Sequence, residues 1–369
     1  MFQSPHVASN WSGQGCWAGQ IPQRAETERK RLVRVSELGE FALIDRLTAR
    51  LPGRPDVLVA AGDDAAVLTP VENSLLVVTC DAQVEGRHFL PHIATPEEIG
   101  HKALAVNLSD IAAMGATPAW ALVSLLLQPD CNVDLVEGIY SGMRQLASRF
   151  GVAIVGGNIS ATTGPLTIDV TAIGSVRREQ VVRRKGARAG DAILVTGTLG
   201  AAGMAVHDAL HPGDLPSELR TELRQAMVAP EPQCRAGIAL DETGVVTSML
   251  DISDGLAADL GHLCDASGSG AIVEAARIPV DIRVRAAGAA LSLDPMTFAL
   301  YGGEDYQLLF TVPDIDVDTV LRALAKAEAS AVVIGHMTSG PAELCLRLPD
   351  GHVESLPRHG WDHLRNLDQ

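Results

Sequence analysis

Acidic side chains stand where apolar segments of this sequence end. In the stretch LDISDGLAADL, Asp251 and Asp254 lie on either side of Ser253, where an apolar strand gives way to leucines at helical spacing. Ser and Asp are frequent helix N-caps, so capping by Ser253 or Asp254 is the simpler interpretation of the stretch by itself. Capping explains only one acid, because Asp251 lies back at the strand exit.

The same arrangement recurs at further acids. Asp63 and Asp64 follow a glycine, Asp81 ends an apolar segment, and Asp110 interrupts an apolar helical face. Each one alone has an ordinary explanation as a turn, a strand end or a buried hydrogen-bonded acid. Together they are costly, because buried carboxylates repel one another unless cations or hydrogen bonds compensate. Several Mg²⁺ ions would compensate and would also bind phosphate, so acids gathered by the fold would indicate a nucleotide-phosphate site.

Signatures of other chemistries are missing from the sequence. It contains no GxxxxGK[ST], HExxH or GxSxG motif and no kinase set of HRD and DFG motifs. The stretch GTLGAAG at 197–203 has only loosely dinucleotide-like spacing, and tight packing between a strand and a helix is the better interpretation. Zinc chemistry and nucleophilic hydrolysis therefore have little support.

The composition indicates a globular protein of two domains. The chain has 369 residues, 47% of them hydrophobic, and a formal net charge of -16 from 29 basic and 45 acidic residues. This excess of acid argues against a general nucleic-acid or anionic-membrane surface and suits a protein that collects cations. The six scattered cysteines show no zinc-type spacing and are expected to be reduced, as in the cytoplasm. The sequence has no apolar run of membrane-spanning length.

Strand and helix patterns alternate from Ser36 onward, which predicts an α/β or α+β protein. Before an Arg- and Gly-rich stretch at 177–191, we expect strands at 73–82, 119–127, 152–157 and 166–176, and helices at 39–47, 97–116 and 133–151. After it, we expect strands at 192–197, 245–250, 305–312, 331–337 and 343–348, and helices at 200–210, at 217–228, after the prolines of 230–244 and from Leu256. The predicted division is a disordered extension at 1–35, an N-terminal domain at 36–187 and a C-terminal domain at 188–369.

A series of long motifs, taken in order, resembles the thiamine-monophosphate kinase family. They are GDDAAVL, TCDAQVEGRHF, HKALAVNLSDIAAMGATPAW, GGN, RRKGARAGDAILVTGTLG, DISDGLAADLGHL and YGGEDYQLLF. The resemblance runs from about Ser36 to the C-terminus. It implies the two-domain fold that the family shares with aminoimidazole ribonucleotide synthetase, in which an N-terminal α/β domain forms a homodimer and a C-terminal α/β domain covers the site.

The resemblance also implies a reaction. ATP would give its γ-phosphoryl group to the phosphate of thiamine monophosphate, producing thiamine diphosphate and ADP with the help of several Mg²⁺ ions. A phosphate group is already a nucleophile at neutral pH, so positioning and charge neutralisation would supply most of the catalysis without a dedicated base. The expected partners are these two substrates and a second copy of the chain, with neither nucleic acid nor membrane, and the expected location is the cytoplasm.

Matching the family's motifs position by position implies the site residues. The metal-binding positions match Asp64, Thr79, Cys80, Asp81, Asp110, Asn158, Asp251 and Asp254. The ATP-contacting positions match Gly157, Asn158, Arg184 and Ser253. The substrate-contacting positions match His88, Glu304 and Trp361, where the indole would stack on the cationic thiamine rings and Glu304 would offset their charge.

Two positions depart from the family pattern. Cys80 stands where the family often has Thr or Ser, and a thiol is a poorer Mg²⁺ ligand, although its backbone carbonyl could serve. Asn158 stands where the family commonly has Asp, so one Mg²⁺ would be held more weakly or through water. Arg183 lies beside Arg184, which leaves the register of the ATP-binding arginine open.

Two other functions stay open at this point. The chain could be another ATP-using enzyme of the same fold, with a different acceptor. It could also be a catalytically quiet homologue that binds nucleotide or thiamine phosphates. Asn158 and Cys80 favour the second alternative, and the presence of the other expected acids argues against it.

Overall fold

The structure is a computed structural model that describes residues 33–61 and 65–360. Two predicted site residues, Asp64 and Trp361, lie outside the described residues, as do Asp63 and residues 1–32 of the expected extension. The remaining predicted site residues are all described.

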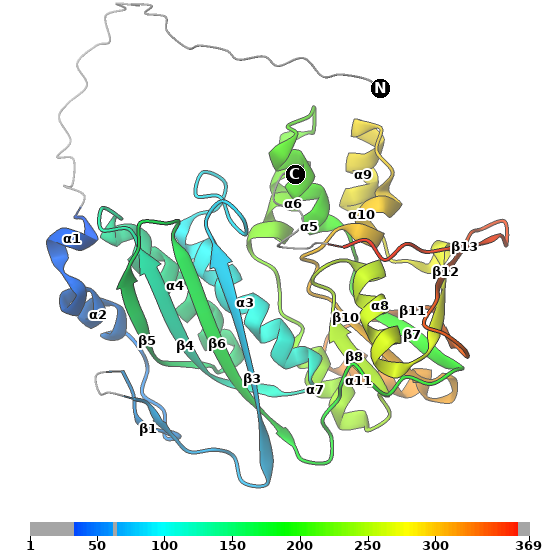
Figure 1. The fold of residues 1–369 in the computed structure, drawn as a ribbon, viewed down its shortest axis with the longest axis horizontal. Helices are drawn as coiled ribbons and strands as arrows, with labels where there is room; N and C mark the ends of the chain where they lie inside the picture. The colour runs from blue at the N-terminus through cyan, green and yellow to red at the C-terminus, as the bar shows by residue number, and fades with distance from the viewer. Residues whose placement is uncertain (1–32, 62–64, 361–369) are drawn as a thin grey trace, which may run out of the picture. The chain divides into compact units, whose positions relative to one another are not determined.

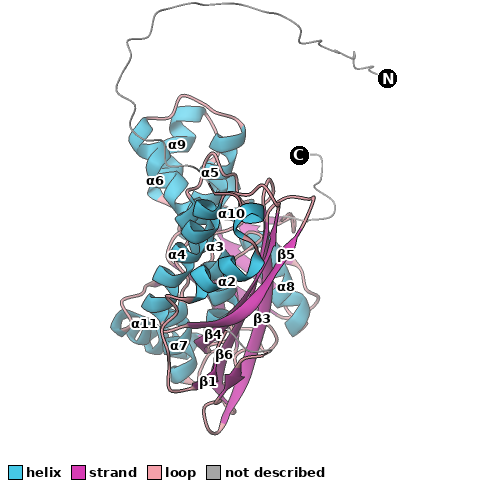
Figure 2. Ribbon diagram, turned by 90° about the vertical axis from the view of Figure 1, so that its left-hand side faces the viewer, coloured by secondary structure: helices cyan, strands magenta, loops and turns pink. Residues whose placement is uncertain are grey.

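A four-stranded sheet forms the first half of the described chain (Figure 1). Its strands, in spatial order, are β3 (Ser74–Val84), β6 (Thr167–Arg177), β4 (Thr117–Leu127) and β5 (Ala153–Ala161). β6 is antiparallel to both neighbours, whereas β4 and β5 are parallel. The helices α3 (Pro96–Ala113) and α4 (Val133–Phe150) lie on one side of these strands (Figure 2).

The ends of α3 and α4 follow from local sequence signals. Thr95 and Glu98 form a capping box at the start of α3, with Pro96 as its first residue. Gly115 follows the end of α3 with a positive φ of 67°, a conformation that glycine adopts without steric cost. The helix ends three residues earlier than expected, and Pro118 lies near the start of β4, where strands tolerate proline.

Short elements precede this sheet. The helices α1 (Val35–Leu38) and α2 (Glu40–Thr48) come first, and the strands β1 (Val57–Val59) and β2 (Val67–Leu68) pair with each other. Val57 and Leu68 pack against a small apolar cluster that contains Trp120. Part of the second face of the four-stranded sheet is therefore covered by β1 and β2, opposite the helices.

A seven-stranded sheet forms the second half. Its spatial order is β13 (Val353–Ser355), β12 (Leu344–Arg347), β9 (Gly270–Glu274), β11 (Ala331–Thr338), β7 (Asp191–Thr196), β10 (Leu308–Pro313) and β8 (Ser248–Asp251). Neighbouring strands are antiparallel except β12 and β9. The helices of this half are α5 (Ala201–Leu210), α6 (Ser217–Val228), α7 (Cys234–Thr243), α8 (Leu256–Ser267), α9 (Ile282–Leu291), α10 (Pro295–Tyr301) and α11 (Val317–Lys326), with short 3-10 turns η1 (Ala275–Arg277) and η2 (Asp314–Asp316).

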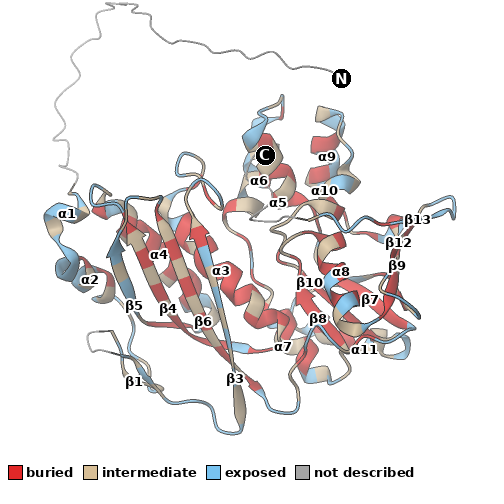
Figure 3. Cartoon of the chain, in the orientation of Figure 1, coloured by how far each residue is buried: buried red, intermediate tan, exposed pale blue. Residues whose placement is uncertain are grey.

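The strand β7, which lies between β11 and β10, is buried on both sides. Ala192 and Leu194 belong to one hydrophobic core, and Ile193 and Val195 belong to another. The first of these cores also contains Leu108 of α3, so residues from both halves share it. Figure 3 shows α3 and the central strands largely buried. The chain passes from the first sheet to the second between the end of β6 and the start of β7, where the Arg- and Gly-rich stretch lies.

The expected strands and helices all occur among the described residues, with shifted ends and several short additions such as α9, α10 and β9. Every helix in the described part of the chain is too short or too polar to cross a lipid bilayer.

Asp241 on α7 is a buried acid that is incompletely hydrogen-bonded. Its side chain packs against Gly115, where an added Cβ would lie 2.7 Å from the Cβ of Asp241. Its Oδ1 atom has no hydrogen-bond partner among the described residues. Burial raises the pKa of Asp241 to about 6.

The substitution Asp241→Asn is therefore expected to stabilise the protein at pH 8 but not at pH 4. A carboxyl group whose pKa is raised by folding destabilises the folded state when it ionises. This destabilisation grows as the pH rises from about 4, the pKa in the unfolded chain, and is complete once the pH passes the pKa in the folded protein. We expect a gain of about 1–2 kcal/mol in the free energy of unfolding at pH 8, vanishing toward pH 4. Urea unfolding across this pH range measures it. Glu242→Gln, at the exposed neighbour, is the control, and a gain independent of pH would contradict the charge explanation.

Candidate active site

The helix α3 carries polar side chains in an otherwise apolar environment. Asn107 and Ser109 are fully buried. Asn107 accepts, through Oδ1, a hydrogen bond of 3.0 Å from the backbone N–H of Asp81. The hydroxyl of Thr79 donates to Asp110 Oδ2 at 2.5 Å. The structure thus brings Thr79, Asp81 and Asp110 together, as predicted from the sequence, by packing α3 against β3.

Ser109 joins this group to the second sheet. Its hydroxyl donates to Asp251 Oδ2 at 2.5 Å, across 142 residues of sequence. Asp251 is the last residue of β8 and is only 5% exposed. Burial, and secondly the negative charge of Asp110, raise the pKa of Asp251 above its usual range. Acids from both halves of the chain therefore meet at α3.

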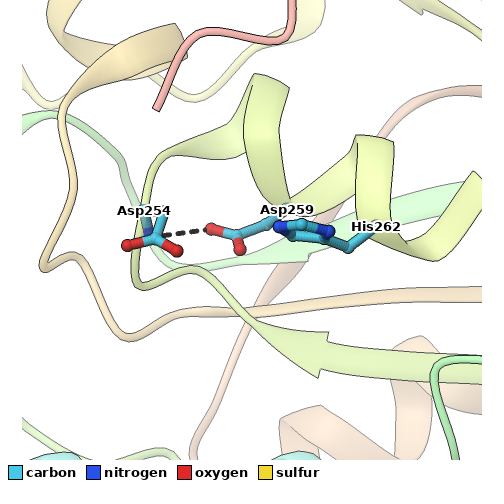
Figure 4. A group of neighbouring side chains, drawn as sticks. All are labelled: Asp254, Asp259 and His262. Carbon is cyan, nitrogen blue, oxygen red and sulfur yellow. Dashed lines mark hydrogen bonds between the residues drawn. The ribbon is translucent and has the colours of Figure 1, made fainter. Parts of the chain in front are cut away.

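The turn after β8 does not cap the next helix. The helix α8 begins after Gly255, which has a φ of 110°, and no side chain accepts a capping hydrogen bond there. The capping interpretation of Ser253 and Asp254 is therefore wrong. The backbone N–H of Asp254 instead donates to Asp259 Oδ2 at 3.0 Å, so α8 supplies an acceptor to the turn (Figure 4).

Asp259 and His262 complete a small cluster with Asp254. One ligand atom from each of these residues lies within 4.8 Å of the others, which fits the size of a cation site. Asp259 is buried, and its burial, followed by the charge of Asp254, raises its pKa to about 8. Sequence reasoning missed Asp259, although an acid in the first turn of the helix that follows the motif was a usable signal.

Residues 302–307 pack directly against the Asp251–Asp254 segment. The backbone N–H of Glu304 donates to Ser253 O at 2.8 Å, and that of Tyr306 donates to Ile252 O at 2.8 Å. Gly303 allows this approach, because an added Cβ would lie 2.5 Å from the oxygen of Ser253. Glu304 and Tyr306 both have positive φ values, of 66° and 50°.

Lys102 of α3 links the two predicted substrate residues. Its ammonium group lies 2.7 Å from Glu304 Oε1 and donates to the backbone oxygen of His88 at 3.0 Å. His88 and Glu304 are thus brought together. The charge of Glu304 is already paired with Lys102. The sequence-based expectation that Glu304 offsets the charge of thiamine did not include this lysine. A lysine within the apolar run of α3 was the available signal.

Tyr306 is buried where carboxylates from both halves of the chain act on it. Burial raises its pKa well above the ordinary value, and the negative charges of Glu304, Asp251, Asp81 and Asp254 add to this effect. A neutral phenol therefore stands among carboxylates from both halves of the chain. Sequence reasoning did not single out this tyrosine.

Arg184 supplies positive charge from an exposed loop. Its guanidinium group lowers the pKa of both Asp251 and Asp259, in opposition to the larger effect of burial. The loop is held to β8 by a hydrogen bond of 3.0 Å from the N–H of Met249 to the oxygen of Arg183. Arg184, rather than Arg183, therefore acts on the carboxylates.

Cys80 turns its side chain away from the face of the sheet that carries Thr79 and Asp81. Successive β3 residues alternate between the two faces of the sheet, so Cys80 points opposite to Thr79 and Asp81. Its thiol donates to Asp169 Oδ1 at 2.9 Å, and a hydrogen bond from Thr171 reaches its sulfur at 3.5 Å. On the side of Asp81, Cys80 can offer only backbone atoms.

Gly157 and Asn158 lie on the opposite edge strand of the sheet. Asp81 pairs with Val170, Val170 with Val123, and Val123 with Gly157, so three strand spacings separate Asp81 from Gly157. This distance is roughly 14 Å. Within one chain, the structure therefore does not bring Asn158 to Asp81, the predicted metal-binding acid of β3.

The donor atoms at α3 fit Mg²⁺. Mg²⁺ prefers oxygen ligands and binds through a few carboxylates together with water or phosphate oxygens. Asp81, Asp110, Asp251 and Asp254 offer such oxygens. Burial first, and then the charge of Asp110, raises the pKa of Asp251, and a bound cation would favour its ionised form.

Comparisons with known proteins show the family of both domains. The family model "AIR synthase related protein, N-terminal domain" matches residues 62–176, and "AIR synthase related protein, C-terminal domain" matches residues 188–344. The thiamine-monophosphate kinase of Escherichia coli (strain K12) is 37% identical over 332 residues, which cover 88% of this chain and 98% of that protein.

Solved structures are similar over the same extent. The crystal structure of thiamine-monophosphate kinase from Stenotrophomonas maltophilia K279a has a TM-score of 0.75 and 37% identity, covering 85% of this chain and 97% of that one. The structure of AaThiL complexed with AMPPCP and TMP has a TM-score of 0.71 and 32% identity, covering 90% and 99%. The predicted two-domain fold is confirmed by these matches, and the chain belongs to the thiamine-monophosphate kinase family.

Proposed function

We propose that this chain transfers the γ-phosphoryl group of ATP to the phosphate of thiamine monophosphate and so produces thiamine diphosphate and ADP. The observation that carries the proposal is that α3 joins acids of both halves: its Ser109 donates a hydrogen bond to Asp251 at the end of β8, and the charge of the adjacent Asp110 acts on the same carboxylate. Membership of the family supports the choice of substrates, since a related structure binds AMPPCP and TMP.

The residues around α3 have distinct tasks in this reaction. Mg²⁺ ions bound by the acids would neutralise negative charge on the phosphates. Ser109 orients Asp251, and Asn107 holds the backbone at Asp81. Arg184 brings positive charge toward the same carboxylates and is suited to an ATP phosphate. The acceptor phosphate needs no general base, because it is ionised at neutral pH.

The proposal gives each predicted site residue a role in binding metal, ATP or thiamine monophosphate. Metal binding belongs to Asp64, Thr79, Asp81, Asp110, Asp251 and Asp254, with Cys80 contributing only its backbone carbonyl. ATP binding belongs to Ser253 and Arg184, with Gly157 and Asn158 acting from the far edge of the sheet. Substrate binding belongs to His88, Glu304 and Trp361. The proposed domains are residues 36–187 and 188–369.

The test is product formation from ATP, Mg²⁺ and thiamine monophosphate, with free thiamine as the control acceptor. Stoichiometric ADP and thiamine diphosphate from the monophosphate alone is the expected result. ATP turnover with a different acceptor from a phosphate-compound panel would indicate another enzyme of the same fold. Ligand binding without any ATP turnover, over a wide range of Mg²⁺ and Mn²⁺, would indicate a binding protein.

The chain acts as a homodimer in this proposal, through the outer face of the four-stranded sheet. Leu76 and Val78 of β3 are 53% and 60% exposed on that face, which is unusual for two neighbouring outward positions of a long strand. β3 is also an edge strand of eleven residues, and long exposed edges are covered in most native proteins. A second copy of the same surface would cover both features.

The double substitution Leu76→Glu with Val78→Glu is expected to convert the protein to a monomer. Charged side chains directly opposite their own copies repel, and the buried apolar area is lost. Light scattering coupled to gel filtration measures the mass. Ile315→Glu, at an 89% exposed position of η2, is the control and should leave a dimer. A wild-type monomer would contradict the proposed assembly.

The proposed location is the cytoplasm. Five cysteines are free among the described residues, which suits a reducing compartment.

A further inference from the structure

A buried lysine stands between the two predicted substrate residues. The side chain of Lys102 is 4% exposed, and its ammonium group contacts both Glu304 Oε1 and the backbone oxygen of His88. Burying an ammonium group is costly unless it is both paired and hydrogen-bonded. An apolar residue would pack on α3 without this cost, so packing does not explain a lysine at this position.

Lys102 shares one face of α3 with Ser109. The two residues are seven positions apart, which corresponds to two helical turns and a rise of about 10 Å. Ser109 holds Asp251, and Lys102 holds Glu304. One rigid helix face therefore fixes an acid of the metal-binding group and an acid of the substrate-binding group at a set distance.

Glu304 needs such support. Its φ of 66° lies in the left-handed region, which is unfavourable for glutamate and persists where neighbouring contacts impose it. Its backbone is held by the hydrogen bond to Ser253, while the contact that holds its carboxylate is the ion pair with Lys102. Glu304 is 25% exposed, so without Lys102 its carboxylate would turn toward water.

We propose that Lys102 is a positioning residue for the acceptor substrate. It holds the carboxylate of Glu304 and the backbone of His88 at fixed places beside α3, so that both meet thiamine monophosphate together. This inference rests on the proposed function.

The test is the substitution Lys102→Met in the full chain, with steady-state kinetics for both substrates. The KM for thiamine monophosphate should rise at least about tenfold, the size expected for losing a charged hydrogen-bond partner. The kcat and the KM for ATP should change by less than about threefold, because the metal-binding acids keep their contacts. Equal changes in all three constants, or an unchanged KM for thiamine monophosphate, would overturn the proposal.

Arg224→Met is the matched control. Arg224 on α6 pairs with Glu98 of α3 at 3.0 Å and donates to the backbone oxygen of Ile93 at 2.8 Å. It therefore joins the same two halves through the same kinds of contact, an ion pair and a hydrogen bond to a backbone oxygen. Both substitutions should lower Tm, but only Lys102→Met should change the KM for thiamine monophosphate selectively.

A double-mutant cycle with Glu304→Gln separates positioning from general stability. If Lys102 acts through Glu304, the substitution Lys102→Met should raise the KM much less in the Glu304→Gln background. Full additivity would overturn the proposal. Should Lys102→Met fail to fold, Lys102→Arg decides in its place, since the planar guanidinium cannot reproduce both ammonium contacts. A selective rise in the KM for thiamine monophosphate is expected, and an unchanged KM contradicts the role.

The wild-type assay keeps the two proposals apart. A wild-type protein that does not phosphorylate thiamine monophosphate contradicts the proposed function. An active wild type whose substrate KM is insensitive to Lys102 contradicts only the positioning role.

Discussion

Replacing Asp251 with asparagine is expected to lower kcat by on the order of 10²–10³-fold without weakening the fold. Asp251 is 5% exposed and accepts the hydroxyl of Ser109, which an asparagine carbonyl would still accept. Its burial and the nearby charge of Asp110 disfavour its ionised form, so a neutral side chain relieves repulsion in the metal-free protein. The carboxylate of Asp251 contributes to catalysis only when a cation and phosphates are bound.

This reasoning predicts opposite effects on activity and stability. With EDTA, the Tm of Asp251→Asn should equal or exceed that of the wild type. Mg²⁺ should raise the Tm of the wild type more than that of the variant, because the variant has lost a ligand that binds only in the folded state. Kinetics and thermal unfolding with and without Mg²⁺ measure both.

Asp208→Asn provides the contrasting control. Asp208 is also buried, but it pairs with Arg220 at 2.7 Å, and that hydrogen bond lowers its pKa despite desolvation. Its loss should reduce Tm and leave kcat unchanged. If Asp251→Asn behaved in the same way as Asp208→Asn, Asp251 would be a structural residue and not a metal ligand.

Replacing Arg184 with methionine is expected to lower kcat/KM for ATP by on the order of 10²-fold. Arg184 is the arginine whose positive charge reaches Asp251 and Asp259. Its guanidinium group is suited to paired hydrogen bonds with a phosphate, and methionine keeps the bulk of the side chain without the charge. Kinetics at varied ATP, with thiamine monophosphate saturating, measure the loss.

Arg183→Met is the matched control, because it removes the same charge one residue earlier in the same loop. The role of Arg183 at β8 is carried by its backbone oxygen, which a substitution retains. We expect a change of less than about threefold for this variant. A larger effect of Arg183→Met than of Arg184→Met would reverse the assignment of the ATP-binding arginine.

Much of the site could be predicted from the sequence because its residues follow local patterns. Asp251 and Asp254 stand where a strand ends, and Asp110 interrupts an apolar helical face. Asp81 follows an apolar run but lies within β3, which continues to Val84. Burial makes such acids costly without a compensating partner. The elements themselves were predictable from periodicity and from end signals such as the Thr95 capping box.

Local sequence pattern was misleading where the same residue type is common in more than one structural role. Ser253 and Asp254 have the residue types of helix caps, yet Gly255 precedes α8 and no side chain caps it. Cys80 adjoins Thr79 and Asp81 in sequence, yet strand alternation sends its thiol to Asp169 on the other face. In the first case the residue before the helix, and in the second the face of the strand, decides what the side chain contacts.

The sequence by itself determined which residues carry charge, which segments form helices and strands, and, through long ordered motifs, the family. The tertiary structure alone decided that Ser109 binds Asp251, that Lys102 pairs with Glu304, and that Gly157, next to Asn158, lies roughly 14 Å from Asp81 within one chain. Periodicity reports the face on which a side chain lies, because it follows from local backbone geometry. The partner on that face depends on how α3 packs between two sheets, and this packing is fixed by long-range burial that no local spacing records.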